Sequence, residues 1–72
     1  MTDAEKTMLA IEAKWWRNAG AKEAYIRERL DMSPVSYYQR LNRLIDTQAA
    51  MAHDPITVKR LLGRRTGQRI AS

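Results

Sequence analysis

The chain has 72 residues, so it holds one domain at most and buries only a small core. It contains no cysteine, which excludes both a disulfide framework and a thiolate metal site. No apolar run approaches the roughly 18 residues of a membrane-spanning helix, and the acidic N-terminus is not typical of a signal peptide. We therefore expect a small cytoplasmic protein.

The net charge of +5 is concentrated near the C-terminus. All eight Asp and Glu residues precede residue 55, together with eight of the thirteen Lys and Arg residues. The remaining basic residues are Lys59, Arg60, Arg64, Arg65 and Arg69. A basic segment without acids usually contacts a polyanion, and the alternative is a tail that only improves solubility.

The first predicted helix spans residues 3–18. Two neighbouring apolar rows at helical spacing indicate it. The rows are Ala4, Met8, Ile11 and Trp15, and then Leu9, Ala13 and Trp16. Thr2 or Asp3 is suited to cap its start, and Gly20 is suited to end it.

A short second helix is predicted over residues 21–30, with Ile26 and Leu30 facing inward. The three residues from Asp31 to Ser33 are too few for anything but a sharp turn. Ser33 is a favourable N-cap, and Pro34 then occupies the first helical position.

The third predicted helix spans residues 34–46. Its inward row follows the i, i+4, i+7, i+8 spacing of a helix. The row is Tyr37, Leu41, Leu44 and Ile45, followed by Gln48.

After the third helix, Thr47 can cap a loose helical turn, and Asp54-Pro55 begins a fourth helix over residues 55–62. Its apolar residues are Ile56, Val58, Leu61 and Leu62. Gly63 is expected to end it, leaving residues 63–72 as a flexible basic tail. The predicted fold is all-α, a bundle of three to four helices over residues 1–62.

The second and third helices, with their short connection, follow the plan of a helix-turn-helix. In that plan the second helix enters the major groove of DNA and its N-terminal residues contact base edges. The turn position that glycine usually holds is Asp31, which can adopt the left-handed conformation at modest cost. Arg27 falls where a small residue is usual, so the two helices are expected to cross more openly.

The outward face of the third helix carries the residue types that read bases. Gln and Asn pair with adenine, Arg pairs with guanine, and Val or a Tyr ring packs on a thymine methyl group. The predicted base-contacting residues are Val35, Ser36, Tyr38, Gln39, Asn42 and Arg43. For any one of them, ordinary packing or solvation is an equally good interpretation, but the set together favours contact.

Other polar residues are placed to hold phosphates, by direct charge or at the start of the third helix. The predicted backbone-contacting residues are Lys22, Ser33, Arg40, Lys59, Arg60, Arg64, Arg65 and Arg69. If about six cations contact phosphates, the logarithm of the affinity should fall against the logarithm of salt with a slope of about −5.

The Trp15-Trp16 pair needs its own explanation. Adjacent helical residues point about 100° apart, so both side chains cannot be buried equally. One is expected in the core. The other either packs beside the fourth helix, which we favour, or forms a partner interface, where exposed Trp is enriched.

The sequence offers no pattern for catalysis, a metal or a cofactor. His53 is the single histidine, and it is expected in the loop before the fourth helix, bonded to the backbone. No serine or threonine has a histidine at a catalytic spacing, and there is no glycine-rich phosphate loop. We expect neither an enzyme nor a cofactor-binding protein.

Several of these landmarks together resemble a family of short actinobacterial proteins, also found in their phages, that is labelled a domain of unknown function. The matching features are Trp15-Trp16, the Gly20–Glu23 turn, Met32-Ser33 before Tyr37-Tyr38, Leu41-Asn42, and Asp54-Pro55 before a basic helix. The resemblance implies an actinobacterial or phage source and a helix-turn-helix-like fold. It implies no activity.

These observations predict a nucleoid-associated DNA-binding protein, either a transcriptional regulator or a phage-encoded protein. A lone module of this size binds weakly, so we expect a homodimer or cooperative binding. The alternative is a small interaction module that docks on a host protein such as RNA polymerase through Trp16 and Tyr38. A single-stranded nucleic-acid binder is less favoured, because Tyr37 belongs to the predicted core.

Overall fold

This computed structural model describes the backbone of residues 1–71 and the side chains of residues 1–64. The described backbone contains five helices and no strand. The helices are α1 (Asp3–Ala13), α2 (Ala19–Leu30), α3 (Pro34–Leu44), α4 (Gln48–His53) and α5 (Pro55–Ala71). The all-α prediction is confirmed. The loose turn predicted after residue 47 is a short helix of its own.

α1 begins where cap chemistry predicted. The Thr2 side chain accepts a hydrogen bond from the Glu5 amide at 3.1 Å, and the Glu5 carboxylate accepts one from the Thr2 amide at 2.8 Å. The backbone and side-chain hydrogen bonds from Thr2 lower the pKa of Glu5. This reciprocal pair satisfies two amides that a helix start leaves without partners.

The predicted end of α1 near residue 18 is wrong, because the helix stops at Ala13. Lys14 turns to an extended conformation, and the Trp16 indole donates to the Ile11 carbonyl at 2.8 Å, which satisfies a carbonyl at the helix end. Asn18 instead begins α2, since its side chain accepts from the Ala21 amide at 2.8 Å. Gly20 therefore lies inside α2 and does not end α1.

The connection between α2 and α3 is a tight left-handed turn. Asp31 has φ 52° and ψ 44°, and its amide donates to the Arg27 carbonyl at 3.0 Å. The left-handed conformation predicted for Asp31 is confirmed. Ser33 caps α3 by accepting from the Ser36 amide at 3.2 Å, and Pro34 is its first residue.

α3 ends at Leu44, two residues earlier than predicted. The Thr47 hydroxyl donates to the Leu44 carbonyl at 2.7 Å and accepts from the Ala50 amide at 3.2 Å. It thus closes one helix and opens the next. Gln48 was predicted to continue the inward row, but it begins α4 and is exposed.

α5 begins at Pro55 as predicted, because the Asp54 carboxylate accepts from the Thr57 amide at 3.2 Å. Hydrogen bonds from the Thr57 side chain and from its amide lower the pKa of Asp54. Gly63 does not end it, and the helical backbone continues to Ala71. Glycine lowers helix stability without forbidding the helical conformation. Ile56, one of the apolar residues of this helix, is 80% exposed and lies outside the core.

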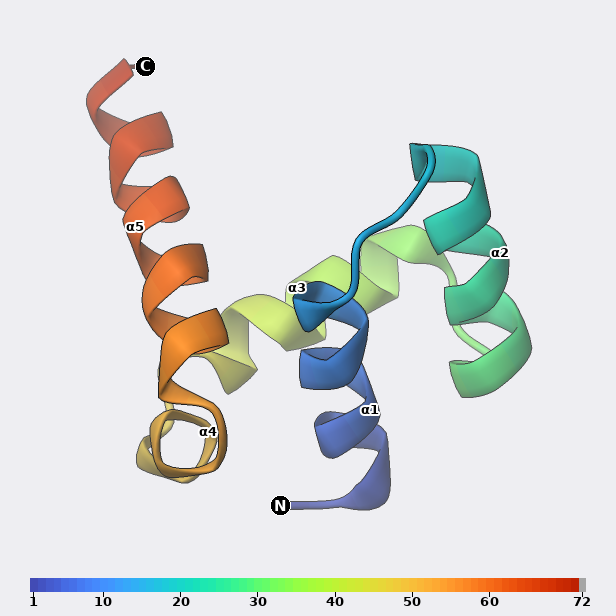
Figure 1. Cartoon of the computed structure of the whole chain (residues 1–72), viewed down its shortest axis with the longest axis horizontal. Helices are drawn as coiled ribbons and strands as arrows, with labels where there is room; N and C mark the ends of the chain where they lie inside the picture. The colour runs from blue at the N-terminus through green and yellow to red at the C-terminus, as the bar shows by residue number, and fades with distance from the viewer. Residues whose placement is uncertain (72) are drawn as a thin grey trace.

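The core lies where α1, α2 and α3 meet and extends to α4 and the first turns of α5 (Figure 1). Ile26, Tyr37, Ala50 and Val58 are fully buried, each from a different helix. α1 stands in front of α3, and α2 runs steeply across α3 (Figure 1). α5 leaves the group of helices on the side opposite α2.

Candidate nucleic-acid interface

The rotation of α3 is fixed by its buried side. Tyr37 is 0%, Leu41 5% and Leu44 4% exposed, so the remaining positions turn outward. The predicted inward residues of α3 are therefore confirmed up to Ile45, which is also buried. Every residue predicted to contact bases is exposed, namely Val35, Ser36, Tyr38, Gln39, Asn42 and Arg43.

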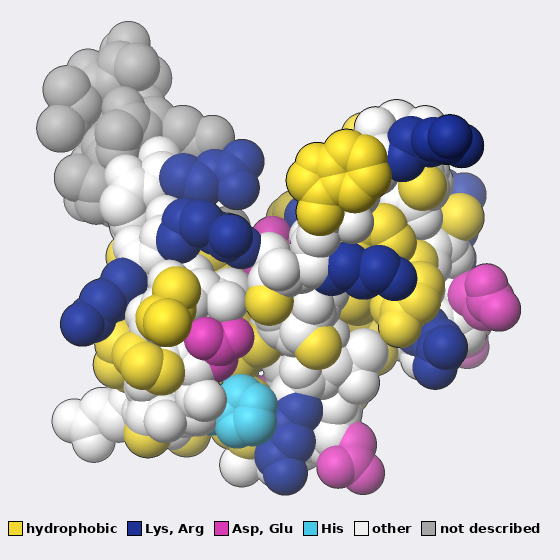
Figure 2. Space-filling view, viewed as in Figure 1, with side chains coloured by type: hydrophobic (Ala, Val, Ile, Leu, Met, Phe, Trp, Pro, Cys, Tyr) yellow, Lys and Arg dark blue, Asp and Glu magenta, His cyan; other side chains and the backbone are white. Residues whose placement is uncertain are grey.

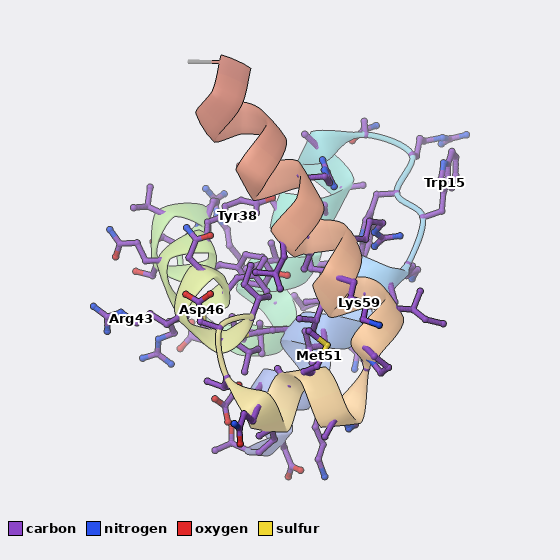
Figure 3. The ribbon with its side chains drawn as sticks, turned by 90° about the vertical axis from the view of Figure 1, so that its left-hand side faces the viewer. Trp15, Tyr38, Arg43, Asp46, Met51 and Lys59 are labelled. Carbon is purple, nitrogen blue, oxygen red and sulfur yellow. The ribbon has the colours of Figure 1, made fainter. Side chains whose placement is uncertain are left out.

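These six residues form what we call the α3 face. Tyr38 and Arg43 lie on the same side of the molecule, away from the side that carries Trp15 and Lys59 (Figure 3). Val35 is 68% and Tyr38 is 42% exposed, which is high for large side chains. The side of the Tyr38 ring is not wholly available, because it packs edge-on against the buried Tyr37 ring at 5.0 Å between centroids.

A buried acid of α1, Glu12, connects α1 to α2 and α3, and it was not among the residues predicted from the sequence. Its side chain accepts a hydrogen bond of 2.5 Å from the Tyr37 hydroxyl and lies 2.8 Å from the Lys22 ammonium. The residue is 8% exposed. Burial and the hydrogen bond to Glu12 raise the pKa of Tyr37 far above its ordinary value. A signal was present, since Glu12 follows Met8 by four residues on the apolar side of α1.

The partners of Glu12 change the predicted phosphate contacts. Lys22 was predicted to hold a phosphate, but its charge is paired with Glu12 and its side chain is only 18% exposed. Its ammonium also lies 5.2 Å from the centroid of the Tyr38 ring. Burial of an unpaired carboxylate costs much free energy, and the Lys22 ammonium offsets that cost for Glu12.

Arg60 has a structural role as well. Its guanidinium donates to the Glu12 carbonyl, at the C-terminal end of α1, and so fastens α5 to α1. A cation at this position also interacts favourably with the helix dipole. Arg60 was predicted to contact phosphate, and that prediction did not include this contact with α1.

The remaining predicted phosphate contacts are divided between different surfaces. Ser33 uses its hydroxyl oxygen to cap α3. Arg40 is exposed on α3, whereas Lys59 is exposed on α5 (Figure 3). Arg65 and Arg69 lie outside the described side chains.

A groove separates α3 from α5, and we call it the α3 groove. Its rim is formed by Tyr38, Asn42, Leu61 and Arg64, and its floor includes Glu12 and Lys22. Arg64 is exposed and lies at the same groove as two predicted base-contacting residues. The helical backbone beyond residue 62 is what brings it there, so the error in the predicted end of α5 matters for the site.

The described residues hold no group of three or more His, Cys, Asp or Glu side chains able to bind a metal ion. His53, predicted in a loop, is the last residue of α4 and is exposed. No helix found among the described residues combines the length and apolar character needed to cross a membrane.

The fold and this surface define a small all-helical protein with an exposed polar and aromatic helix beside a basic one. The chain belongs to the DUF3263 family, whose members are described as proteins of unknown function, and the family model matches residues 1–71. Comparison with curated proteins and with solved structures gave no match.

Proposed function

We propose that the protein binds double-stranded DNA as a helix-turn-helix module, with α3 in the major groove. The observation that carries the proposal is the α3 face, where six residues suited to base contacts are exposed together on a helix whose rotation is fixed by Tyr37 and Leu41. The three-residue turn at Asp31 and the steep crossing of α2 and α3 also support it (Figure 1). The nucleoid localisation and the actinobacterial or phage source belong to the same proposal.

Arg64 is the best-supported phosphate contact of α5, because it lies at the α3 groove with Tyr38 and Asn42. Arg40 adds a second cation from α3 itself. Since Lys22 and Arg60 have partners inside the protein, the salt dependence should be shallower than six contacts would give. About four phosphate contacts correspond to a slope of about −3.6. A homodimer or cooperative binding would bring the affinity into the specific range.

The alternative, docking on a host protein through Trp16 and Tyr38, loses support at Trp16. The Trp16 indole donates to the Ile11 carbonyl, and its ring packs at 5.0 Å from Tyr25. Trp16 therefore has a structural task, and a protein interface would have to use other aromatic residues.

The test is selection of fragmented genomic DNA by the purified protein at about 0.15 M salt, where unspecific phosphate binding is weakened. An enriched sequence is the expected result, and a palindrome in it would give the spacing of a two-fold dimer. Gln39→Ala should lower affinity for the enriched site about tenfold and leave unspecific binding unchanged. Gln48→Ala is the matched control, because Gln48 is also exposed but lies on α4.

Two results would overturn the proposal. Even recovery of all fragments would remove base reading by α3, and no recovery at any salt would remove DNA binding altogether. Equal losses from Gln39→Ala and Gln48→Ala would remove the specific role of the α3 face.

A further inference from the structure

Trp15 is the most exposed of the described large hydrophobic side chains, at 81%. Its exposure follows from its neighbour. The chain leaves α1 in an extended conformation at Lys14, and Trp16 turns inward to bond the Ile11 carbonyl and pack on Tyr25. Successive side chains of an extended segment point in opposite directions, so burial of Trp16 holds Trp15 outside.

Trp15 stands at the rim of a second depression, which we call the Trp15 cleft. Lys14, Trp15 and Trp16 line one wall, and Arg60 and Arg64 from α5 line the other. Figure 2 shows this side of the molecule, with Lys and Arg side chains on both sides of the hollow between α5 and the α1–α2 connection.

The accessible charge of the Trp15 cleft is positive. Glu12 is the one acid among its described lining residues, and its carboxylate is buried and paired with Lys22 at 2.8 Å. Lys14 and Arg64 are exposed, and so is Arg17 beside them in the sequence. An exposed indole surrounded by cations, with no accessible acid, is complementary to an anionic ligand with an apolar part.

We propose that the Trp15 cleft binds an acidic segment of a partner protein, with a large apolar side chain of that segment packed on the Trp15 indole. Trp is the residue most typical of energetic centres in protein interfaces, and the surrounding cations select an acidic partner. The role of Trp15 does not depend on DNA binding, since the α3 face lies on the other side of α5 (Figure 3) and only Arg64 is assigned to both sites.

The geometry favours a protein segment over single-stranded nucleic acid. A single-stranded nucleic acid is held by several aromatic platforms on which successive bases stack. Here the neighbouring rings are already in use, since Lys14 lies 4.7 Å from the Trp16 ring centroid and Arg29 lies 5.1 Å from that of Tyr25. One exposed indole suits one apolar anchor.

The test measures fluorescence anisotropy of a labelled peptide that alternates glutamate and leucine, titrated with the full chain at low and at moderate salt. We expect binding that weakens with salt. Trp15→Ala should reduce the affinity about tenfold or more, the effect of losing an interface centre. Ile56→Ala is the matched control, because Ile56 is 80% exposed but does not line the cleft.

A second pair of variants tests the charge. Arg64→Ala should reduce affinity for the peptide several-fold and flatten its salt dependence, whereas Lys6→Ala, at an exposed position of α1, should change neither. Circular dichroism should show unchanged helix content for all four variants, since each side chain is exposed.

Four results of the binding titrations would overturn the proposal. These are no binding of the peptide at low salt, equal binding by Trp15→Ala, equal binding of a peptide with glutamine in place of glutamate, and tighter Trp15-dependent binding of an oligothymidylate. Concentration-dependent dimerisation lost in Trp15→Ala would also overturn it, by making a second copy the occupant. DNA selection by the α3 face, tested separately, should be unaffected by Trp15→Ala.

Discussion

Two grooves flank α5, and they share a floor but differ at their rims. Glu12 and Lys22 line both the α3 groove and the Trp15 cleft. At the α3 groove, Tyr38 is held by the Tyr37 ring and by the Lys22 ammonium, and it is 42% exposed. At the Trp15 cleft, the indole is 81% exposed.

The difference separates side chains that build the protein from those available to a ligand. On the floor, the charges of Glu12 and Lys22 pair with each other, because a buried carboxylate requires a cation and a hydrogen-bond donor. Tyr38 is divided between packing and exposure. Trp15 is little buried, so it exposes a larger part of its apolar side chain than Tyr38 does, without an evident role in packing. Variants of the floor should therefore change stability, and variants of the rims should change binding.

Removing the shared floor should have the largest effect. Glu12→Ala leaves the partly buried Lys22 without its partner and removes the nearer of the two acceptors of the Tyr37 hydroxyl, the other being the Met8 carbonyl at 3.2 Å. We expect a loss of about 3 kcal/mol in the free energy of unfolding. Urea unfolding followed by circular dichroism measures it, and Glu28→Ala, an exposed acid of α2, is the control. A loss no greater than that of the control would mean that Glu12 does not hold the helices together.

A smaller change to the floor is Tyr37→Phe, which removes only the hydroxyl that donates to Glu12. We expect a loss of about 1 to 2 kcal/mol at neutral pH. The folded state raises the pKa of Tyr37, so it keeps a proton that the unfolded chain releases above about pH 10. Wild-type stability from this group is complete below about pH 10 and falls as the pH rises further.

The pH dependence distinguishes this mechanism from a simple packing loss. The difference in the free energy of unfolding between wild type and Tyr37→Phe should narrow above about pH 10. The wild type loses the stabilisation from its protonated Tyr37 hydroxyl in this range, whereas the variant has no hydroxyl to titrate. A constant difference across the alkaline range would contradict the role assigned to the Tyr37 proton.

The wall common to both grooves is α5, and Gly63 is a residue of low helix propensity within it. No atom outside its own helix backbone and chain neighbours lies within 4 Å of where a Cβ would be, so alanine fits without displacement. Gly63→Ala should stabilise the protein by about 0.5 to 1 kcal/mol and raise its helix content. The same measurements on Gly20→Ala give a comparison, since a Cβ there would make an ordinary van der Waals contact with the Asn18 cap at 3.4 Å. Destabilisation by Gly63→Ala would indicate that the helix ends at Gly63, as its sequence first suggested.

The parts of the fold predicted correctly are those decided within a few residues. Thr2, Ser33, Thr47 and Asp54 each act as the cap that their position predicted, because a cap bonds an amide three residues away. The left-handed Asp31 is local in the same sense. Where two local signals competed, the prediction failed: Asn18 caps α2, so the neighbouring Gly20 could not end α1.

The floor could not be predicted in this way, because its contacts are distant in the sequence. Tyr37 and Glu12 are 25 residues apart, and Arg60 reaches the Glu12 carbonyl over 48 residues. The sequence alone therefore predicts Lys22 and Arg60 as phosphate contacts, because their partners inside the protein follow only from the arrangement of the helices. The α3 face was predictable, since its outward positions follow from the spacing of Tyr37, Leu41 and Leu44 alone.

The smallest expected difference compares the two aromatic rims directly. Tyr38→Ala removes an edge-on contact with Tyr37 and a cation–π contact with Lys22, so it should cost about 0.5 to 1 kcal/mol in the free energy of unfolding. Trp15→Ala should change it by less than about 0.5 kcal/mol, the range of ordinary surface substitutions, although it deletes a larger side chain. Parallel urea unfolding of both variants decides the matter. If Trp15→Ala proved the more destabilising, the indole would be packed against the protein in solution, and its surface would not be available to an acidic partner.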